Sequence, residues 1–122
     1  MSLPRPLLLL LALTTACTST TVPIDVGGVE VRAANGELSI HNATPSPVFT
    51  FTVGREAAAL VDWIACAEPR CDPLPAGADR KIPLSQIIGG TEPELNFYWW
   101  HGVATPNGWK PDSIRNAIVK TR

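Results

Sequence analysis

Apolar and polar residues alternate most regularly in residues 29–40. Val29 and Val31 alternate with the charged residues Glu30 and Arg32, and Leu38 and Ile40 alternate with Ser39 and His41. Between the two runs stands Asn35-Gly36, a pair that tolerates the positive φ angles of a type I′ turn. The pattern predicts a β-hairpin with one face toward a core.

Three further segments have strand character. Residues 48–53 alternate apolar side chains with threonines after the breaker at residues 44–47, which predicts a third strand with one buried face. Residues 80–87 predict a short strand that Pro83 interrupts, and therefore a strand at a sheet edge. Residues 94–103, rich in aromatic side chains, form the most strand-like run of the chain.

Two segments leave alternatives open. Within residues 55–66 apolar side chains recur at helical spacing, while residues 60–65 also read as a short buried strand. We favour the strand, because strands are predicted on both sides. Residues 113–122 predict either a final strand or a short helix capped by Asp112 or Ser113.

Six or seven short strands separated by turns within about 100 residues predict an all-β fold. We expect a small antiparallel β-sandwich of immunoglobulin-like or fibronectin-like architecture over residues 24–122. The likeness is one of architecture only, because Cys66 and Cys71 are too close in sequence to join two sheets as the immunoglobulin disulfide does.

The N-terminus has the layout of a secretory signal peptide. An apolar run, Leu7 to Leu13, follows Arg5 and is too short to span a bilayer, which takes about 20 apolar residues. Small residues and then Cys17 come directly after it. A cut after Ala16 would leave Cys17 at the new N-terminus, as a free thiol if the site is an ordinary secretory one.

Residues 13–17, Leu-Thr-Thr-Ala-Cys, resemble the lipobox of bacterial lipoproteins, although Thr14 stands where that pattern has Leu, Val or Ile. The resemblance implies removal of residues 1–16, lipidation of Cys17 with diacylglycerol and palmitate, and a polar tether over residues 17–23. Two acyl chains suffice for stable membrane anchoring. The resemblance further implies export and a lipid anchor in the bacterial cell envelope, on the periplasmic face of the outer membrane in a Gram-negative species.

Setting Cys17 aside leaves Cys66 and Cys71, an even pair in an oxidising compartment. Four intervening residues, Pro69 among them, let the chain double back, so we expect a local disulfide on a tight turn. A redox pair would more often show two intervening residues, and a zinc site would show a second ligand pair.

Charge and motifs narrow the range of functions. Ten basic and eleven acidic residues give a net charge of −1, which does not suggest a nucleic-acid partner. None of the nucleophile-elbow, Walker, HExxH and dinucleotide-binding motifs occurs, and we expect neither an enzyme nor a cofactor.

The candidate chemical groups are few. His41 and His101 would be needed for a metal site, but strand parity places them on different faces, so we expect no metal. Glu92, Glu94 and Asp62 are expected to be solvated charges rather than a general-acid pair. Asn42-Ala43-Thr44 matches a glycosylation acceptor, which we treat as a chance match.

The aromatic run offers the one candidate contact surface. Phe97 and Trp99 share the parity of Leu95 and are expected in the core, so Tyr98 and Trp100 belong to the outer face. Together with Trp109, these two side chains could contact a ligand. The alternative is that the C-terminal strand or the Trp109 loop folds across them.

These observations predict a non-catalytic, lipid-anchored envelope protein that presents a β-sandwich for structural or protein-contact purposes. The alternative is a glycan- or peptide-binding module that uses Tyr98, Trp100 and Trp109. The expected partners are a membrane, through the anchor, and an envelope protein or glycan.

Overall fold

The protein is all-β. The computed structural model describes residues 21–122, in which nine strands and three 3-10 turns follow one another. The strands are β1 (Ile24–Val26), β2 (Val29–Ala34), β3 (Glu37–Asn42), β4 (Phe49–Gly54), β5 (Asp79–Pro83), β6 (Glu94–Trp100), β7 (Gly102–Thr105), β8 (Gly108–Pro111) and β9 (Arg115–Lys120). The turns are η1 (Ala57–Leu60), η2 (Pro69–Cys71) and η3 (Leu84–Gln86).

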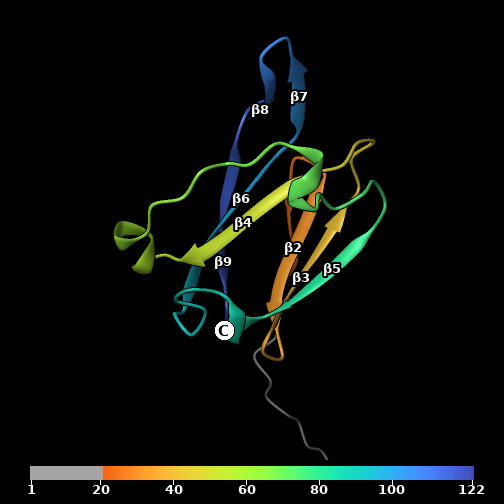
Figure 1. The fold of residues 1–122 in the computed structure, drawn as a ribbon. Helices are drawn as coiled ribbons and strands as arrows, with labels where there is room; N and C mark the ends of the chain where they lie inside the picture. The colour runs from red at the N-terminus through yellow and green to blue at the C-terminus, as the bar shows by residue number, and fades with distance from the viewer. Residues whose placement is uncertain (1–20) are drawn as a thin grey trace, which may run out of the picture.

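The strands form two packed sheets and a projecting hairpin (Figure 1). One sheet has the order β1-β2-β3-β5 and the other β4-β6-β9, while β7 and β8 pair only with each other. The predicted small antiparallel β-sandwich is confirmed. Its division into four and three strands is that of a constant-type immunoglobulin domain, but the strand order differs because β2 pairs with β3, the next strand in the chain.

The predicted hairpin at residues 29–40 is confirmed as β2 and β3, which pair from Val29 opposite Asn42 to Ala34 opposite Glu37. Asn35 and Gly36 have φ angles of 54° and 76°, as the type I′ turn requires. The expected edge strand is also present as β5, which ends at Pro83, where the chain turns into η3. At the C-terminus the strand alternative is the observed one, as β9.

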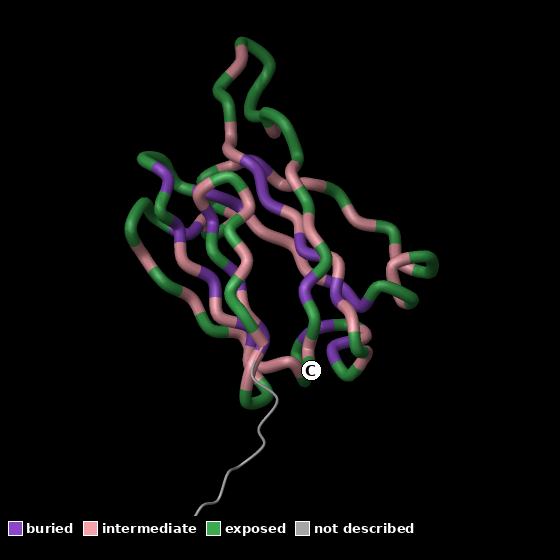
Figure 2. Tube along the Cα trace, turned by 180° about the vertical axis from the view of Figure 1, so that it is seen from behind, coloured by how far each residue is buried: buried purple, intermediate pink, exposed green. Residues whose placement is uncertain are grey.

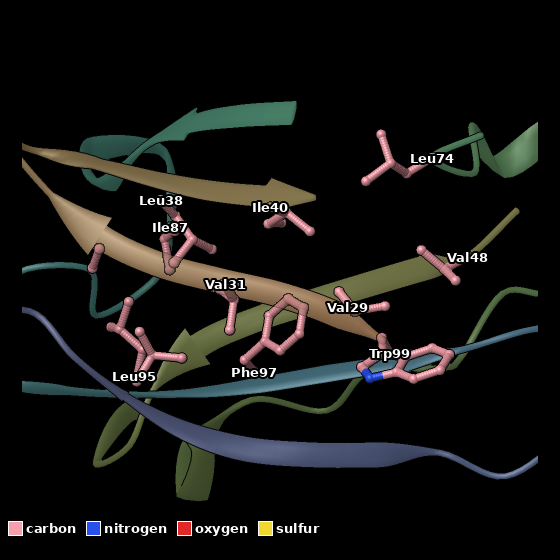
Figure 3. Packing of buried hydrophobic residues seen from close by; sticks show 12 residues of the cluster. Val29, Val31, Leu38, Ile40, Val48, Leu74, Ile87, Leu95, Phe97 and Trp99 are labelled. Carbon is pink, nitrogen blue, oxygen red and sulfur yellow. The ribbon is translucent and has the colours of Figure 1, made fainter. Parts of the chain in front are cut away.

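The core lies between the two sheets (Figure 3). Side chains of the four-stranded sheet point toward those of β6 and β9. The four-stranded sheet contributes Val29, Val31, Leu38 and Ile40 to this core, and β6 and β9 contribute Leu95, Phe97, Trp99 and Val119. The expected alternation along β6 is therefore confirmed: Leu95, Phe97 and Trp99 are at most 1% exposed.

The register of β4 places its aromatic side chains away from this core. Thr50 lies opposite Trp99 and Thr52 opposite Phe97, so the threonines share the inner face. Phe49 and Phe51, opposite Trp100 and Tyr98, lie on the outer face of the same sheet. Along β6 the three-stranded sheet consequently carries aromatic side chains on both faces.

The predicted strand at residues 60–65 is wrong. The chain forms η1 and then continues without regular structure to η2, passing over the outer face of β4 and β6 instead of pairing with a strand edge. Leu60 and Ile64 are 89% and 92% exposed, because this segment buries every second side chain against the sheet and turns the others to solvent. We call residues 61–71 the covering segment.

The two ends of the sandwich differ. Thr21, where the described residues begin, donates a hydrogen bond to the Ala33 carbonyl close to the Asn35-Gly36 turn. The β7–β8 hairpin projects from the opposite end and is largely exposed (Figure 2). Residues 21–122 contain no helix long and apolar enough to cross a membrane. The predicted signal peptide and the lipidation of Cys17 lie outside the described residues.

Candidate functional site

Five aromatic side chains gather on the outer face of the three-stranded sheet. We call them the outer aromatic cluster: Phe49, Phe51, Trp63, Tyr98 and Trp100. Trp63, from the covering segment, lies over the sheet with ring centroids 4.4 Å from Phe51, 5.0 Å from Tyr98 and 5.7 Å from Trp100. The cluster is a second, smaller core that closes the sheet from outside.

This cover changes the expectation for Tyr98 and Trp100. Both lie on the outer face, as predicted, but Trp100 is only 3% exposed and its indole N–H donates to the Cys66 carbonyl at 3.0 Å. Tyr98 is half-buried beneath Trp63. Trp100 is therefore a packing residue and not an exposed ligand contact. The cover is the covering segment, and neither of the two elements expected from the sequence.

The carboxylates considered for acid catalysis have structural partners. The Glu92 side chain accepts hydrogen bonds from the N–H groups of Glu56, at 2.6 Å, and Ala57, at 3.1 Å, where η1 begins. Glu94 pairs with Arg55 at 2.6 Å. Asp62 is exposed on the covering segment. Glu92 therefore satisfies N–H groups that the first turn of a helix leaves unpaired.

The predicted disulfide between Cys66 and Cys71 is formed, with 6.3 Å between the Cα atoms. It closes the turn that contains η2, and Cys71 packs against the outer aromatic cluster. The disulfide thus fixes the end of the covering segment next to Trp100.

Opening this disulfide with Cys66→Ser is expected to lower the free energy of unfolding by about 1 to 3 kcal/mol, because a short loop gains little chain entropy on opening. Denaturant unfolding of the variant and the unaltered protein measures the difference. Alkylation should label Cys66 and Cys71 only after reduction. Labelling of both thiols in the native, unreduced protein would contradict the disulfide.

The two histidines do not share a site. The Nδ1 atom of His41 lies 2.7 Å from the Asp79 carboxylate on the outer face of the four-stranded sheet. The Nδ1 atom of His101 lies 2.9 Å from the Pro47 carbonyl, after the end of β6. Among residues 21–122 no three His, Cys, Asp or Glu side chains gather in a way that could hold a metal ion.

Asn42, in the acceptor-like triplet, is buried and fully hydrogen-bonded. Its amide group donates to the carbonyls of Ser46, at 2.8 Å, and Leu74, at 3.0 Å. Its side-chain oxygen accepts from the Thr44 N–H, at 2.9 Å, and the Thr44 hydroxyl, at 2.6 Å. In the folded protein the Asn42 amide is therefore a tertiary link and has no room for a glycan.

An apolar groove of about 450 Å³ opens at the base of the β7–β8 hairpin. Trp109, 47% exposed, forms one wall, and prolines form much of the rest. The lining residues are Ser46, Pro47, Phe49, Ala67, Pro69, Pro73, His101, Gly102 and Trp109. A side chain at Gly102 would meet the Ala67 carbonyl at 2.4 Å, so this glycine permits the close approach of the covering segment to β7.

Polar contacts hold the hairpin in place beside the groove. The Asp112 carboxylate accepts the His101 N–H at 2.8 Å and binds Arg115 at 3.1 Å. Burial acts to raise the pKa of Asp112, but the hydrogen bonds from His101 and Arg115 and the charge of Arg115 outweigh it, so this pKa lies below its usual value. The Arg115 guanidinium also lies 4.2 Å from the Trp99 ring centroid.

The groove joins a residue that the sequence identified, Trp109, to residues that it did not. From the sequence, Pro47 was predicted to lie in a breaker, Pro69 in the disulfide turn, and Phe49 in a strand with one buried face. The three prolines and Gly102 line one cavity because the loops at residues 45–47 and 67–73 meet the hairpin in the folded chain. No periodicity in the sequence of those loops predicts this contact. Comparison with protein-family models, with curated proteins and with solved structures found no match.

Proposed function

We propose that this is a non-catalytic, lipid-anchored protein of the bacterial cell envelope that binds a partner polypeptide through the groove beside Trp109. The groove is the observation that carries the proposal. Its lining is mostly apolar, and an exposed tryptophan next to prolines suits the insertion of a large apolar side chain. The nearby titratable groups, His101 and Asp112, are engaged with backbone groups and the hairpin.

The position of the groove also suits this role. A lipid on Cys17 would tether the end of the sandwich at which Thr21 lies beside the β2–β3 turn. The β7–β8 hairpin projects from the other end (Figure 1), and the groove opens at its base. Anchored in this way, the protein would hold the groove away from the membrane surface.

The binding part of the proposal is tested by titrating the protein with short peptides that carry a single central leucine, phenylalanine or tryptophan, and following tryptophan fluorescence. At least one peptide is expected to give a saturable change that Trp109→Ala abolishes. Because Trp109 is half-exposed, the variant should keep its stability within about 0.5 kcal/mol. Val103→Ala, on the same hairpin but outside the groove, is the matched control and should bind normally.

A saturable response to soluble cello- or chito-oligosaccharides, with none to the peptides, would instead support the glycan-binding alternative. The anchor is tested separately, by expressing the full chain in a bacterium and analysing its N-terminal peptide. An acylated Cys17, and loss of membrane association in Cys17→Ser, are expected. A soluble product with an unmodified Cys17 would refute the anchor and leave the groove untouched.

A further inference from the structure

The free edge of β4 carries backbone groups with no partner among the described residues. The Arg55 N–H donates to the Glu94 carbonyl at 3.0 Å, which fixes the alternation of hydrogen-bonded pairs between β4 and β6. By this alternation Phe51 bonds to β6, whereas Thr50 and Thr52 point their N–H and C=O groups away from it. Within residues 21–122 the N–H and C=O groups of Thr50 and Thr52 have no hydrogen-bond partner.

Both ends of this edge are closed. Val48 exchanges two backbone hydrogen bonds with Leu74, at 3.0 and 2.7 Å, and the Gly54 N–H donates to the Ile88 carbonyl at 2.7 Å. The stretch from Val48 to Gly54 spans about 20 Å at the rise of a strand. Between these two closures only residues 50–52 are open.

The opening leads into a groove of about 250 Å³ between β4 and β5, and no charged residue lines it. Its walls are Thr50, Phe51, Thr52, Ile82, Gln86, Ile87 and Ile88. The Thr52 hydroxyl is buried there and has no hydrogen-bond partner. Buried polar groups in native proteins nearly always have one, so this hydroxyl is a second sign of an unfilled site.

The other edges of the two sandwich sheets have the features that discourage pairing with another chain. β1 is three residues long, β5 carries Asp79, Lys81 and Pro83, and β9 carries Arg115 and Lys120 and lies against the first two strands. Short length, charge and proline are the usual protections of an edge strand. The residues of β4, Phe-Thr-Phe-Thr-Val-Gly, include none of these.

We propose that residues 50–52 of β4 form a strand-addition site for a three-residue extended segment of a partner polypeptide. Its backbone would bond to the free N–H and C=O groups of Thr50 and Thr52. Its first and third side chains, uncharged and apolar, would lie opposite these two threonines on the inner face of β4 and would enter the groove toward Ile82 and Ile87. A second copy of this chain does not fit, because its own β4 edge is flanked by Leu74 and Ile88, which would occupy the place of the pairing strand. The site is separate from the groove at Trp109.

The test is a titration of the ¹⁵N-labelled protein with a capped pentapeptide, serine-valine-threonine-valine-serine, followed by NMR. Saturable shifts are expected at the amides of Thr50 and Thr52. Thr52→Pro removes one outward N–H from an edge position where proline is tolerated, and it is expected to weaken binding about tenfold or more. Lys81→Pro, which removes an outward N–H from the β5 edge, is the matched control and should leave binding unchanged.

A second variant guards against misfolding of Thr52→Pro. Ile88 is 58% exposed at the rim of the groove, so Ile88→Lys should fold normally and should also weaken binding about tenfold. Absence of a saturable shift in the unaltered protein would overturn the proposal. Equal binding of a peptide with glutamate in place of both valines, or unaltered binding by Ile88→Lys, would overturn it as well.

Discussion

Replacing Trp100 with alanine is expected to lower the free energy of unfolding by about 3 to 5 kcal/mol, the range for a buried aromatic side chain. Trp100 is almost completely buried beneath the covering segment, stacks with Phe49 at a centroid distance of 6.3 Å and donates its indole N–H to Cys66. The variant would lose these contacts and leave the Cys66 carbonyl without its donor. Denaturant unfolding measures the loss.

Trp99→Ala provides the comparison between the core that lies between the sheets and the outer aromatic cluster. Trp99 lies in the core between the sheets and donates to the Val26 carbonyl at 2.7 Å, so its removal should cost at least as much. A loss below about 1 kcal/mol in Trp100→Ala, typical of an exposed site, would show that the covering segment does not bury this side chain in solution.

Replacing Asn42 with alanine is expected to lower the free energy of unfolding by about 3 kcal/mol, because it removes four hydrogen bonds of a buried side chain, each of which contributes about 0.5 to 1.5 kcal/mol. These bonds join Asn42 to the carbonyls of Ser46 and Leu74 and to the N–H and hydroxyl of Thr44, and the Thr44 N–H would be left without an acceptor. Their loss would loosen the connection between β3 and β4 and the segment that leads into β5. Thermal and denaturant unfolding both measure the change.

Asn116 provides the matched control for Asn42. It is exposed on β9 and none of the side-chain hydrogen bonds of residues 21–122 involves it, so Asn116→Ala should stay within about 0.5 kcal/mol of the unaltered protein. Equal effects of the two substitutions would mean that the hydrogen bonds of Asn42 do not contribute to stability.

The local patterns predicted local structure well. The alternation around Asn35-Gly36 gave the hairpin with its turn, and the shared parity of Leu95, Phe97 and Trp99 gave the core face of β6. Both depend on neighbours in sequence, for which side-chain alternation and turn chemistry are sufficient. The disulfide followed for the same reason, because its two cysteines are five residues apart.

The covering segment and the groove depended on contacts between distant residues. Trp63 was predicted to lie in a buried strand. An aromatic residue among apolar ones has the same sequence pattern whether its segment pairs with other strands in a sheet or crosses the face of that sheet. Its stacking on Phe51 and Tyr98 joins residues up to 35 positions apart. The burial of Trp100 follows from this arrangement, so of the predicted contact residues only Trp109 remains in the candidate site.

The covering segment is attached in a way that distinguishes it from the sandwich. None of the backbone–backbone hydrogen bonds within residues 21–122 involves residues 61–67, and the segment is held by aromatic contacts, the Trp100 indole and the disulfide turn. A layer without a hydrogen-bond ladder can open as a local unit while the paired strands beneath it stay closed. We therefore expect two levels of cooperativity, a sandwich that unfolds as a whole and a layer whose brief opening from β4 and β6 would expose Tyr98 and Trp100.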